Sequence, residues 1–219
     1  MSMSLRRERC RKWKLYAITC PEKLSGRDVA RAVEEALRGG ASVVQLRDKN
    51  ASDQELLRQA KQILPITRRF GVPLIVNDRL QVAKEAGADG LHLGQDDGPL
   101  SEARRLLGDE ALIGRSTHSP EQALEAEREG FDYIGVGPVH PTPTKPGRPG
   151  TGLEFVRFAA SNLSVPFVAI GGIDETNIAE AVEAGAVTVA VVRALLGQAQ
   201  PQEAARRLLR SMEMERKKA

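Results

Sequence analysis

The chain has 219 residues, of which 41% are hydrophobic; this fits one large domain or two small ones and excludes global disorder. The net charge of +3 is uneven, because residues 1–14 carry +5 and residues 216–218 carry +3, which leaves −5 for the rest. Two basic ends on a mildly acidic body, with 4% aromatic residues available to stack on bases, argue against nucleic-acid binding and predict solvated tails.

The compartment is expected to be the cytoplasm. Cys10 and Cys20 lie too near one end to staple a fold by a disulfide, which favours a reducing environment. No apolar run approaches the roughly 20 residues of a membrane span, and the start MSMSLRRERCRKWK lacks the apolar core of a signal peptide. We therefore expect a soluble protein without a membrane partner.

Short apolar runs alternate with amphipathic stretches along the whole chain. Taken in order, the runs predict strands at residues 14–19, 42–47, 73–77, 90–94, 112–116, 133–137, 166–171 and 188–192. A helical pattern follows each of them, at residues 28–40, 53–71, 79–87, 100–108, 120–130, 153–163, 175–185 and 200–218. Several of these helices end in glycine shortly before the next strand, which is a common helix stop.

Eight strand and helix units predict an α/β fold, a single compact (β/α)8 TIM barrel. The rival is an open doubly wound sheet, but a dinucleotide-binding sheet would show G-x-G-x-x-G after its first strand, where this chain reads ITCPEKLSG. We expect a basic N-terminal extension over residues 1–13, the barrel over 14–212 and a charged tail over 213–219. In such barrels the chemistry lies at the carboxyl ends of the strands.

Three polar residues, Gln45, Arg47 and Lys49, alternate at the end of the second predicted strand. Residues spaced by two leave the same side of a strand, and a barrel strand has no solvent-facing side, so the three should gather at the mouth of the barrel. An arginine fork and a lysine point charge suit phosphate oxygens. The pattern predicts an anionic ligand.

Acidic residues end the next two strands. Asn77 and Asp78 close the third, and Asp96 and Asp97 follow the fourth. A single aspartate of this kind is usually a helix cap or a turn residue. Two acidic groups on neighbouring strands, beside an arginine and a lysine, instead match an Mg²⁺ site completed by water and phosphate oxygens. Asp78 and Asp97 are the predicted metal ligands.

The fifth strand ends in Ser116, which could hydrogen-bond a phosphate, and Ser119 before Pro120 reads as a helix N-cap. The sixth strand runs into the loop GPVHPTPTKPGRPG, residues 137–150. Its prolines restrict the chain around Thr142, Thr144 and Lys145, so that less entropy is lost when the loop orders on a ligand. This favours a closing lid over an unstructured connection.

The loops after strands seven and eight predict a second anion site. They contain Gly171, Gly172, Val192 and Arg193. Glycines here could serve only close packing, but these loops form the usual phosphate site of such barrels, from backbone amides and a helix N-terminus. The three histidines, His92, His118 and His140, have no spacing that suggests a zinc site or a catalytic triad. We expect His92 in the interior, His118 in the loop after strand five, and His140 near substrate.

The motifs QLRDK, VND, HLGQDD, GRS, GPVHPTPTK, AIGGI and VAVVRA occur in the order and spacing of thiamine phosphate synthase. Each motif alone is weakly specific, but the seven in sequence are highly specific. The chain resembles this family from Leu15 to about Leu196. Two features depart from the family pattern: Arg193 stands where many relatives have serine, and the basic segment before Lys14 has no counterpart.

The resemblance implies a transferase of a non-methyl alkyl group in thiamine biosynthesis. Such an enzyme joins 4-amino-2-methyl-5-hydroxymethylpyrimidine diphosphate to thiazole phosphate, and diphosphate leaves first in an Mg²⁺-assisted, dissociative reaction. By motif, the pyrimidine diphosphate would be bound by Gln45, Arg47, Lys49, Asn77, Ser116 and Lys145, with Arg47, Lys49, Ser116 and Lys145 catalytic. Asp78 and Asp97 would bind Mg²⁺, and Thr142, Thr144, Gly172, Val192 and Arg193 would hold the thiazole phosphate.

Two alternatives remain at this point. A thiazole tautomerase on the same barrel would not need the diphosphate-binding set. A sensor of phosphate ligands without turnover would bind its ligand regardless of Mg²⁺ and release no diphosphate. The sequence also leaves a homo-oligomer open.

Overall fold

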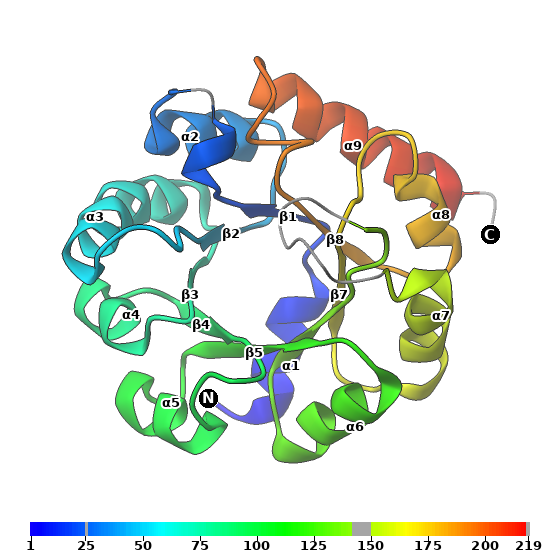
Figure 1. Ribbon diagram of the computed structural model, residues 1–219, viewed down its shortest axis with the longest axis horizontal. Helices are drawn as coiled ribbons and strands as arrows, with labels where there is room; N and C mark the ends of the chain where they lie inside the picture. Colours follow the sequence, from blue (N-terminus) through cyan, green and yellow to red (C-terminus); the bar gives the residue numbers. More distant parts are fainter. Residues whose placement is uncertain (25, 142–149, 218–219) are drawn as a thin grey trace.

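The computed structural model describes residues 1–24, 26–141 and 150–217. Eight parallel strands form a closed ring in chain order, seen end-on in Figure 1, so the predicted barrel is confirmed. The strands are β1 (Leu15–Ile18), β2 (Val43–Leu46), β3 (Leu74–Asn77), β4 (Gly90–Leu93), β5 (Leu112–Thr117), β6 (Tyr133–Val136), β7 (Phe167–Ile170) and β8 (Thr188–Val191). The ring closes where β1 pairs with β8, with Tyr16 opposite Ala190.

Helices cover the outside of the ring (Figure 1). They are α2 (Val29–Arg38), α3 (Asp53–Phe70), α4 (Leu80–Ala86), α5 (Leu100–Leu107), α6 (Pro120–Glu129), α7 (Gly152–Asn162), α8 (Ile178–Glu183) and α9 (Pro201–Arg216), with a short 3₁₀ turn η1 (Pro21–Lys23) after β1. Gly71 ends α3 in the left-handed conformation at φ 66°, as the glycine stops predict. Ser119 caps α6 by accepting from the Gln122 amide, as expected.

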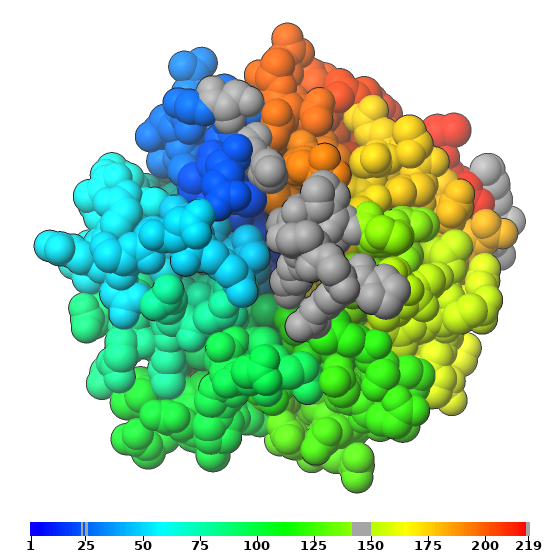
Figure 2. Space-filling model, viewed as in Figure 1, coloured from blue at the N-terminus to red at the C-terminus, as the bar shows by residue number. Residues whose placement is uncertain are grey.

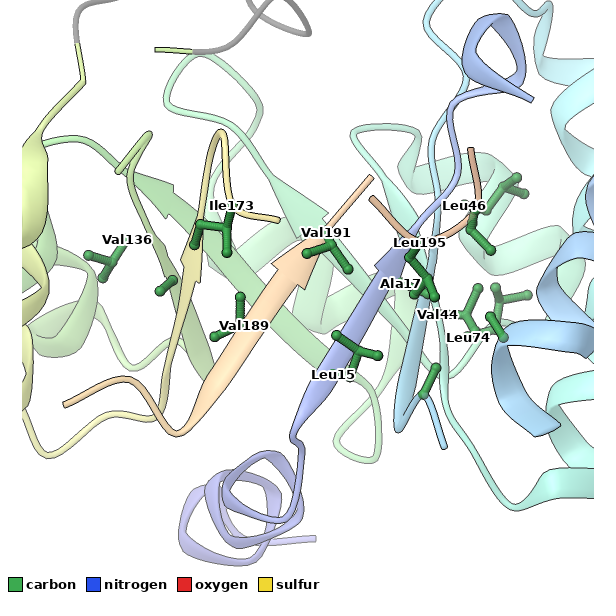
Figure 3. Packing of buried hydrophobic residues seen from close by; sticks show 14 of the residues in the cluster. Leu15, Ala17, Val44, Leu46, Leu74, Val136, Ile173, Val189, Val191 and Leu195 are labelled. Carbon is green, nitrogen blue, oxygen red and sulfur yellow. The ribbon is translucent and has the colours of Figure 1, made fainter. Parts of the chain in front are cut away.

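Strand side chains divide into two apolar layers because successive residues point to opposite sides. Figure 3 shows part of the outer layer, in which Leu15, Ala17, Val44 and Leu74 pack toward the helices. A second cluster fills the inside of the ring, and its members are Cys10, Trp13, Tyr16, Ile18, Val43, Ile75, Leu112, Tyr133, Val168 and Ala190. The interior is therefore packed, and ligands can enter only at its ends.

An additional helix, α1 (Met3–Arg11), lies across the N-terminal ends of the strands, behind the ring in Figure 1. Its Arg6 is 7% exposed and donates to the Asp132 carboxylate over 2.7 Å. Arg104 donates to the other oxygen of the same carboxylate, also over 2.7 Å. The expectation of a solvated basic tail is therefore wrong for Arg6, because Asp132, a buried acid just before β6, holds it.

The cysteines near the chain start, Cys10 and Cys20, are both buried. None of the helices among the described residues is long and apolar enough to cross a membrane.

Candidate active site

A cavity of about 270 Å³ opens at the carboxyl ends of the strands, on the face shown in Figure 2. All eight strands contribute to its wall. Seven of the predicted site residues line it: Gln45, Arg47, Asn77, Ser116, Gly172, Val192 and Arg193. Three others, Thr142, Thr144 and Lys145, lie outside the described residues, so their place in the site stays a prediction.

The end of β2 brings its polar residues to one edge of this mouth. Thr19 fixes the chain here, because its hydroxyl accepts from the Arg47 amide over 2.8 Å and donates to the Arg47 carbonyl over 3.0 Å. Gln45 and Arg47 reach the cavity. Lys49 lies beyond the cavity wall, with its Nζ 3.9 Å from Oδ2 of Asp78. The edge therefore carries two cations close to an acid.

The two predicted metal ligands lie close enough for their carboxyl groups to hydrogen-bond. Burial is the largest cause that raises the pKa of Asp78, to about 6, and the hydrogen bond and charge of Asp97 add to it. The positive charges of Lys49 and Arg47 oppose this shift. Asp97 is oriented by the Gly94 amide, which donates to its Oδ2 over 2.5 Å. A cation between the two acids would relieve their repulsion.

The donor set fits Mg²⁺, which takes few carboxylates and completes its octahedron with water and phosphate oxygens. Within the described part of the chain, no group of three or more His, Cys, Asp or Glu side chains could hold a metal. Any ion at Asp78 and Asp97 would therefore need further oxygen ligands. The adjacent Arg47 and Lys49 would place a phosphate-bearing ligand where it could supply them.

The opposite side of the mouth is built from backbone. Gly171 and Gly172 follow β7 at φ 107° and 63°, and a Cβ on Gly172 would lie 2.7 Å from the Cβ of His140. The His140 amide donates to the Gly171 carbonyl over 3.0 Å, so the chain after β6 runs against these glycines. Only residues without a side chain allow this close approach.

A buried polar atom also faces this region. Nε2 of His140 has no hydrogen-bond partner among the residues that the structure describes. Hydrogen bonds from the Thr176 amide and hydroxyl are the largest cause that lowers the pKa of Asp174, and electrostatic interactions with Arg193 and then His140 add to it. Contact between His140 and a ligand stays a prediction, and an orphaned ring nitrogen is consistent with it.

The segment after β8 differs from the expectation of a helix N-terminus. Residues 193–197 form turns, in which the Leu195 and Leu196 amides donate to the Val192 carbonyl, and α9 begins only at Pro201. Val192 and Arg193 still line the cavity. Any anion there would meet turn amides and the Arg193 side chain rather than the end of a helix.

The floor of the cavity contains residues that were not predicted to belong to the site. Tyr16 and Tyr133 are fully buried there and hydrogen-bond to each other. His92 is 9% exposed and bonded to both Tyr133 and Ser116, so its expected interior place is confirmed. The sequence did offer a signal for these floor residues, because the chain has two tyrosines and both stand at inward-facing strand positions.

A family model described as thiamine monophosphate synthase matches residues 15–195. The thiamine-phosphate synthase of Synechocystis is 46% identical over 202 residues, which are 92% of this chain and 58% of that protein. The enzyme of that name from Thermus thermophilus is 52% identical over 176 residues, 80% of this chain and 84% of that protein. A solved structure, thiamine phosphate pyrophosphorylase from Pyrococcus furiosus, has a TM-score of 0.85 at 36% identity and covers 94% of this chain and 98% of its own. The chain thus spans just over half the length of the Synechocystis relative.

Proposed function

Because the chain belongs to the thiamine monophosphate synthase family, we propose that it is a transferase that makes thiamine monophosphate. Its substrates would be 4-amino-2-methyl-5-hydroxymethylpyrimidine diphosphate and a thiazole phosphate, and diphosphate would be the second product. The observation that carries this proposal is the carboxylate pair Asp78 and Asp97 beside Lys49 and Arg47. Of these four residues Arg47 lines the cavity, whose floor is aromatic, and the acids lie next to it, outside the cavity wall.

The pyrimidine ring would enter the cavity between Gln45, Asn77 and Ser116. Its diphosphate would then lie at the edge formed by Arg47 and Lys49, with Lys145 as a further cation. This arrangement matches the chemistry of each part, because amide and hydroxyl groups suit a heteroaromatic edge and cations suit phosphate oxygens.

Asp78 and Asp97 would hold Mg²⁺. When bound, Mg²⁺ supplies a Lewis acid that neutralises charge on the diphosphate oxygens. The two acids themselves lie on neighbouring strand ends, and Lys49 Nζ at 3.9 Å from Asp78 Oδ2 keeps a cation beside them. Without a metal, the two carboxyl groups face each other, and burial and the neighbouring Asp97 raise the pKa of Asp78.

The thiazole phosphate would occupy the side of the mouth built by Gly172, Val192 and Arg193, with Thr142 and Thr144 approaching from the loop. Left-handed glycines leave the backbone open to a phosphate. The two substrates would thus meet above the cavity floor, with their anionic groups on opposite sides.

The reaction needs charge stabilisation more than proton transfer. The bond between the pyrimidine methylene carbon and the diphosphate oxygen breaks, and its electron pair leaves with diphosphate. The lone pair of the thiazole nitrogen then forms the new carbon–nitrogen bond. Arg47 and Lys49 would stabilise the departing charge, and a closed mouth would keep water from the pyrimidine cation.

Diphosphate release, followed with a coupled assay, tests this function. The complete protein with both substrates and Mg²⁺ should release diphosphate in step with thiamine monophosphate. EDTA should abolish the reaction and excess Mg²⁺ should restore it. Binding of both substrates without release would indicate a sensor instead, and turnover that EDTA does not affect would contradict the metal assignment.

A further inference from the structure

Five polar side chains form an unbroken hydrogen-bond chain across the inside of the barrel. Gln45 Nε2 donates to Tyr16 Oη over 3.0 Å, and Tyr16 Oη lies 3.1 Å from Tyr133 Oη. Tyr133 Oη lies 3.1 Å from Nδ1 of His92, whose Nε2 lies 2.9 Å from Ser116 Oγ. Both ends of this chain, Gln45 and Ser116, line the cavity.

The hydrogen bonds of this five-residue chain must all run in the same direction, from donor to acceptor. Each tyrosine hydroxyl has one proton and two partners in the chain, so it donates to one and accepts from the other. If Gln45 donates to Tyr16, then Tyr16 donates to Tyr133 and Tyr133 donates to Nδ1 of His92. A neutral His92 then carries its proton on Nε2 and donates to Ser116, whose own proton is left for the cavity.

The opposite direction is equally self-consistent. A Gln45 amide turned over would accept from Tyr16 through its Oε1, and Tyr133 would donate to Tyr16. His92 would then donate from Nδ1 and accept from the Ser116 hydroxyl at Nε2. The orientation of one end therefore fixes the hydrogen-bonding role of the other.

Burial prevents water from interrupting the chain. Tyr16 is 1% exposed and Tyr133 is fully buried. The Trp13 ring packs edge-on against both, with ring centroids 5.7 and 4.9 Å away. Burial also raises the pKa of both tyrosines, so both hydroxyls keep their protons. If the hydrogen bond at one end reverses its donor and acceptor, every other hydrogen bond in the chain must therefore reverse as well.

We propose that Tyr16, Tyr133 and His92 are positioning residues that couple the amide orientation of Gln45 to the donor role of Ser116. In the direction that the structure shows, Gln45 keeps Oε1 as an acceptor for the cavity and Ser116 offers a hydroxyl donor. A 4-aminopyrimidine offers a partner for each, an amino donor for Gln45 and a ring-nitrogen acceptor for Ser116. This inference rests on the proposed function for the identity of the ligand, but the coupling itself does not.

The tautomer of His92 reports the direction and can be measured without substrate. The complete protein is labelled with ¹⁵N-histidine, and its three histidine signals are assigned with His118→Gln and His140→Gln variants. We expect His92 to carry its proton on Nε2 in the unmodified protein. In Gln45→Glu, a carboxylate that can only accept should reverse the chain and place a proton on Nδ1.

Cutting the chain separates this effect from a change in local charge. In the double variant Gln45→Glu with Tyr16→Phe the carboxylate remains but the link is lost, so Nδ1 should lose its proton again. Gln54→Glu, on the exposed face of α3, adds the same charge elsewhere and should leave His92 unchanged. The proposal is overturned if His92 keeps one tautomer in all four proteins, or if the reversal persists without the Tyr16 hydroxyl.

Kinetics provide a second readout. Tyr16→Phe retains the packing but frees the Gln45 amide, and should raise KM for the pyrimidine diphosphate about tenfold, the effect of one lost hydrogen bond. KM for the thiazole phosphate should not change, and an equal rise for both substrates would count against the coupling. An unmodified protein that makes no thiamine monophosphate would refute the proposed function, while the NMR result would still decide the coupling.

Discussion

Asp78 combines two features that are unfavourable for folding. Its φ of 60° lies in the left-handed region, where aspartate and asparagine are less strained than most other residues. Its half-buried carboxyl group also lies against that of Asp97, and its pKa is raised to about 6. Local destabilisation of this kind is common at functional sites, where the geometry serves ligand binding and not the stability of the fold.

We therefore expect Asp78→Asn to stabilise the metal-free protein, by about 1–2 kcal/mol at pH 7 after allowance for solvent screening. Asparagine keeps the shape and tolerates the backbone conformation but removes the charge. Because the folded pKa is the higher one, the proton stabilises the fold at low pH, and that benefit is lost as pH rises through about 6.

Urea unfolding at pH 4 and pH 7 checks this expectation, and the two proteins should differ only at the higher pH. The same variant should lower kcat on the order of 100-fold with Mg²⁺ present, since a charge-stabilising group is lost. An Asp78→Asn protein less stable than the unmodified one at pH 7 would contradict the strain assigned to this carboxyl group.

The place of a site residue was predictable from the sequence where it follows from the alternation along one strand and from where that strand ends. Gln45 and Arg47 reach the cavity because alternation along β2 places them there, and Asp78 and Asp97 meet because neighbouring parallel strands end together. The contact between Tyr16 and Tyr133 was not predictable in this way. It joins β1 to β6 across the ring, and only the register of the closed barrel brings these two inward positions together.

At the level of elements, α1 is the helix that the sequence pattern does not predict. Its sequence, MSLRRERCR, has four arginines and no apolar stripe, so it does not resemble a helix that packs on a core. It is docked by polar contacts far along the chain, in which Arg6 bonds to Asp132 and Arg7 to the Phe131 carbonyl, and by Cys10, which packs in the interior cluster. Strands and outer helices were predictable because their apolar patterns are local.

Arg6→Ala should detach α1 at a cost of about 2–3 kcal/mol, near the lower end for breaking a buried ion pair, because Arg104 still holds Asp132. Arg9→Ala, on the exposed side of the same helix, should change stability by less than about 0.5 kcal/mol.

Alkylation of Cys10 reports the detachment directly. The thiol is 1% exposed and burial raises its pKa, so it should react slowly in the unmodified protein. Peptide mass mapping after iodoacetamide treatment should show faster labelling of Cys10 in Arg6→Ala and no change in Arg9→Ala. Equal labelling in the two variants would argue against the ion pair as the anchor of α1.

At the scale of the whole molecule, the barrel interior is filled by large side chains that pack against glycines on nearby strands. A Cβ at Gly114 would lie 2.2 Å from the Tyr133 ring, whereas one at Gly135 would lie 3.6 Å from the His92 ring. The two glycines are on adjacent strands, β5 and β6, and point to the same interior. They form a matched pair for testing how tightly the interior is packed.

Gly114→Ala should destabilise the protein by about 2 kcal/mol, because it forces the Tyr133 ring to move in a filled interior. Gly135→Ala should be neutral or stabilising by up to about 1 kcal/mol, since its methyl group has room and the unfolded chain loses freedom. Thermal unfolding of the two variants measures the difference, and a loss of similar size in both would show that the interior does not discriminate between them.

The closure between β1 and β8 also bears on self-association. A closed ring has no edge strand with which a strand of another molecule could pair. Pairing between edge strands is how many open sheets aggregate. α9 packs against α2, α8 and β1, so it spans the outside of this seam. If loss of α9 allowed β1 and β8 to separate, two unpaired strand edges would be exposed at once. The solubility of the protein on heating would then depend on how firmly its last helix stays docked.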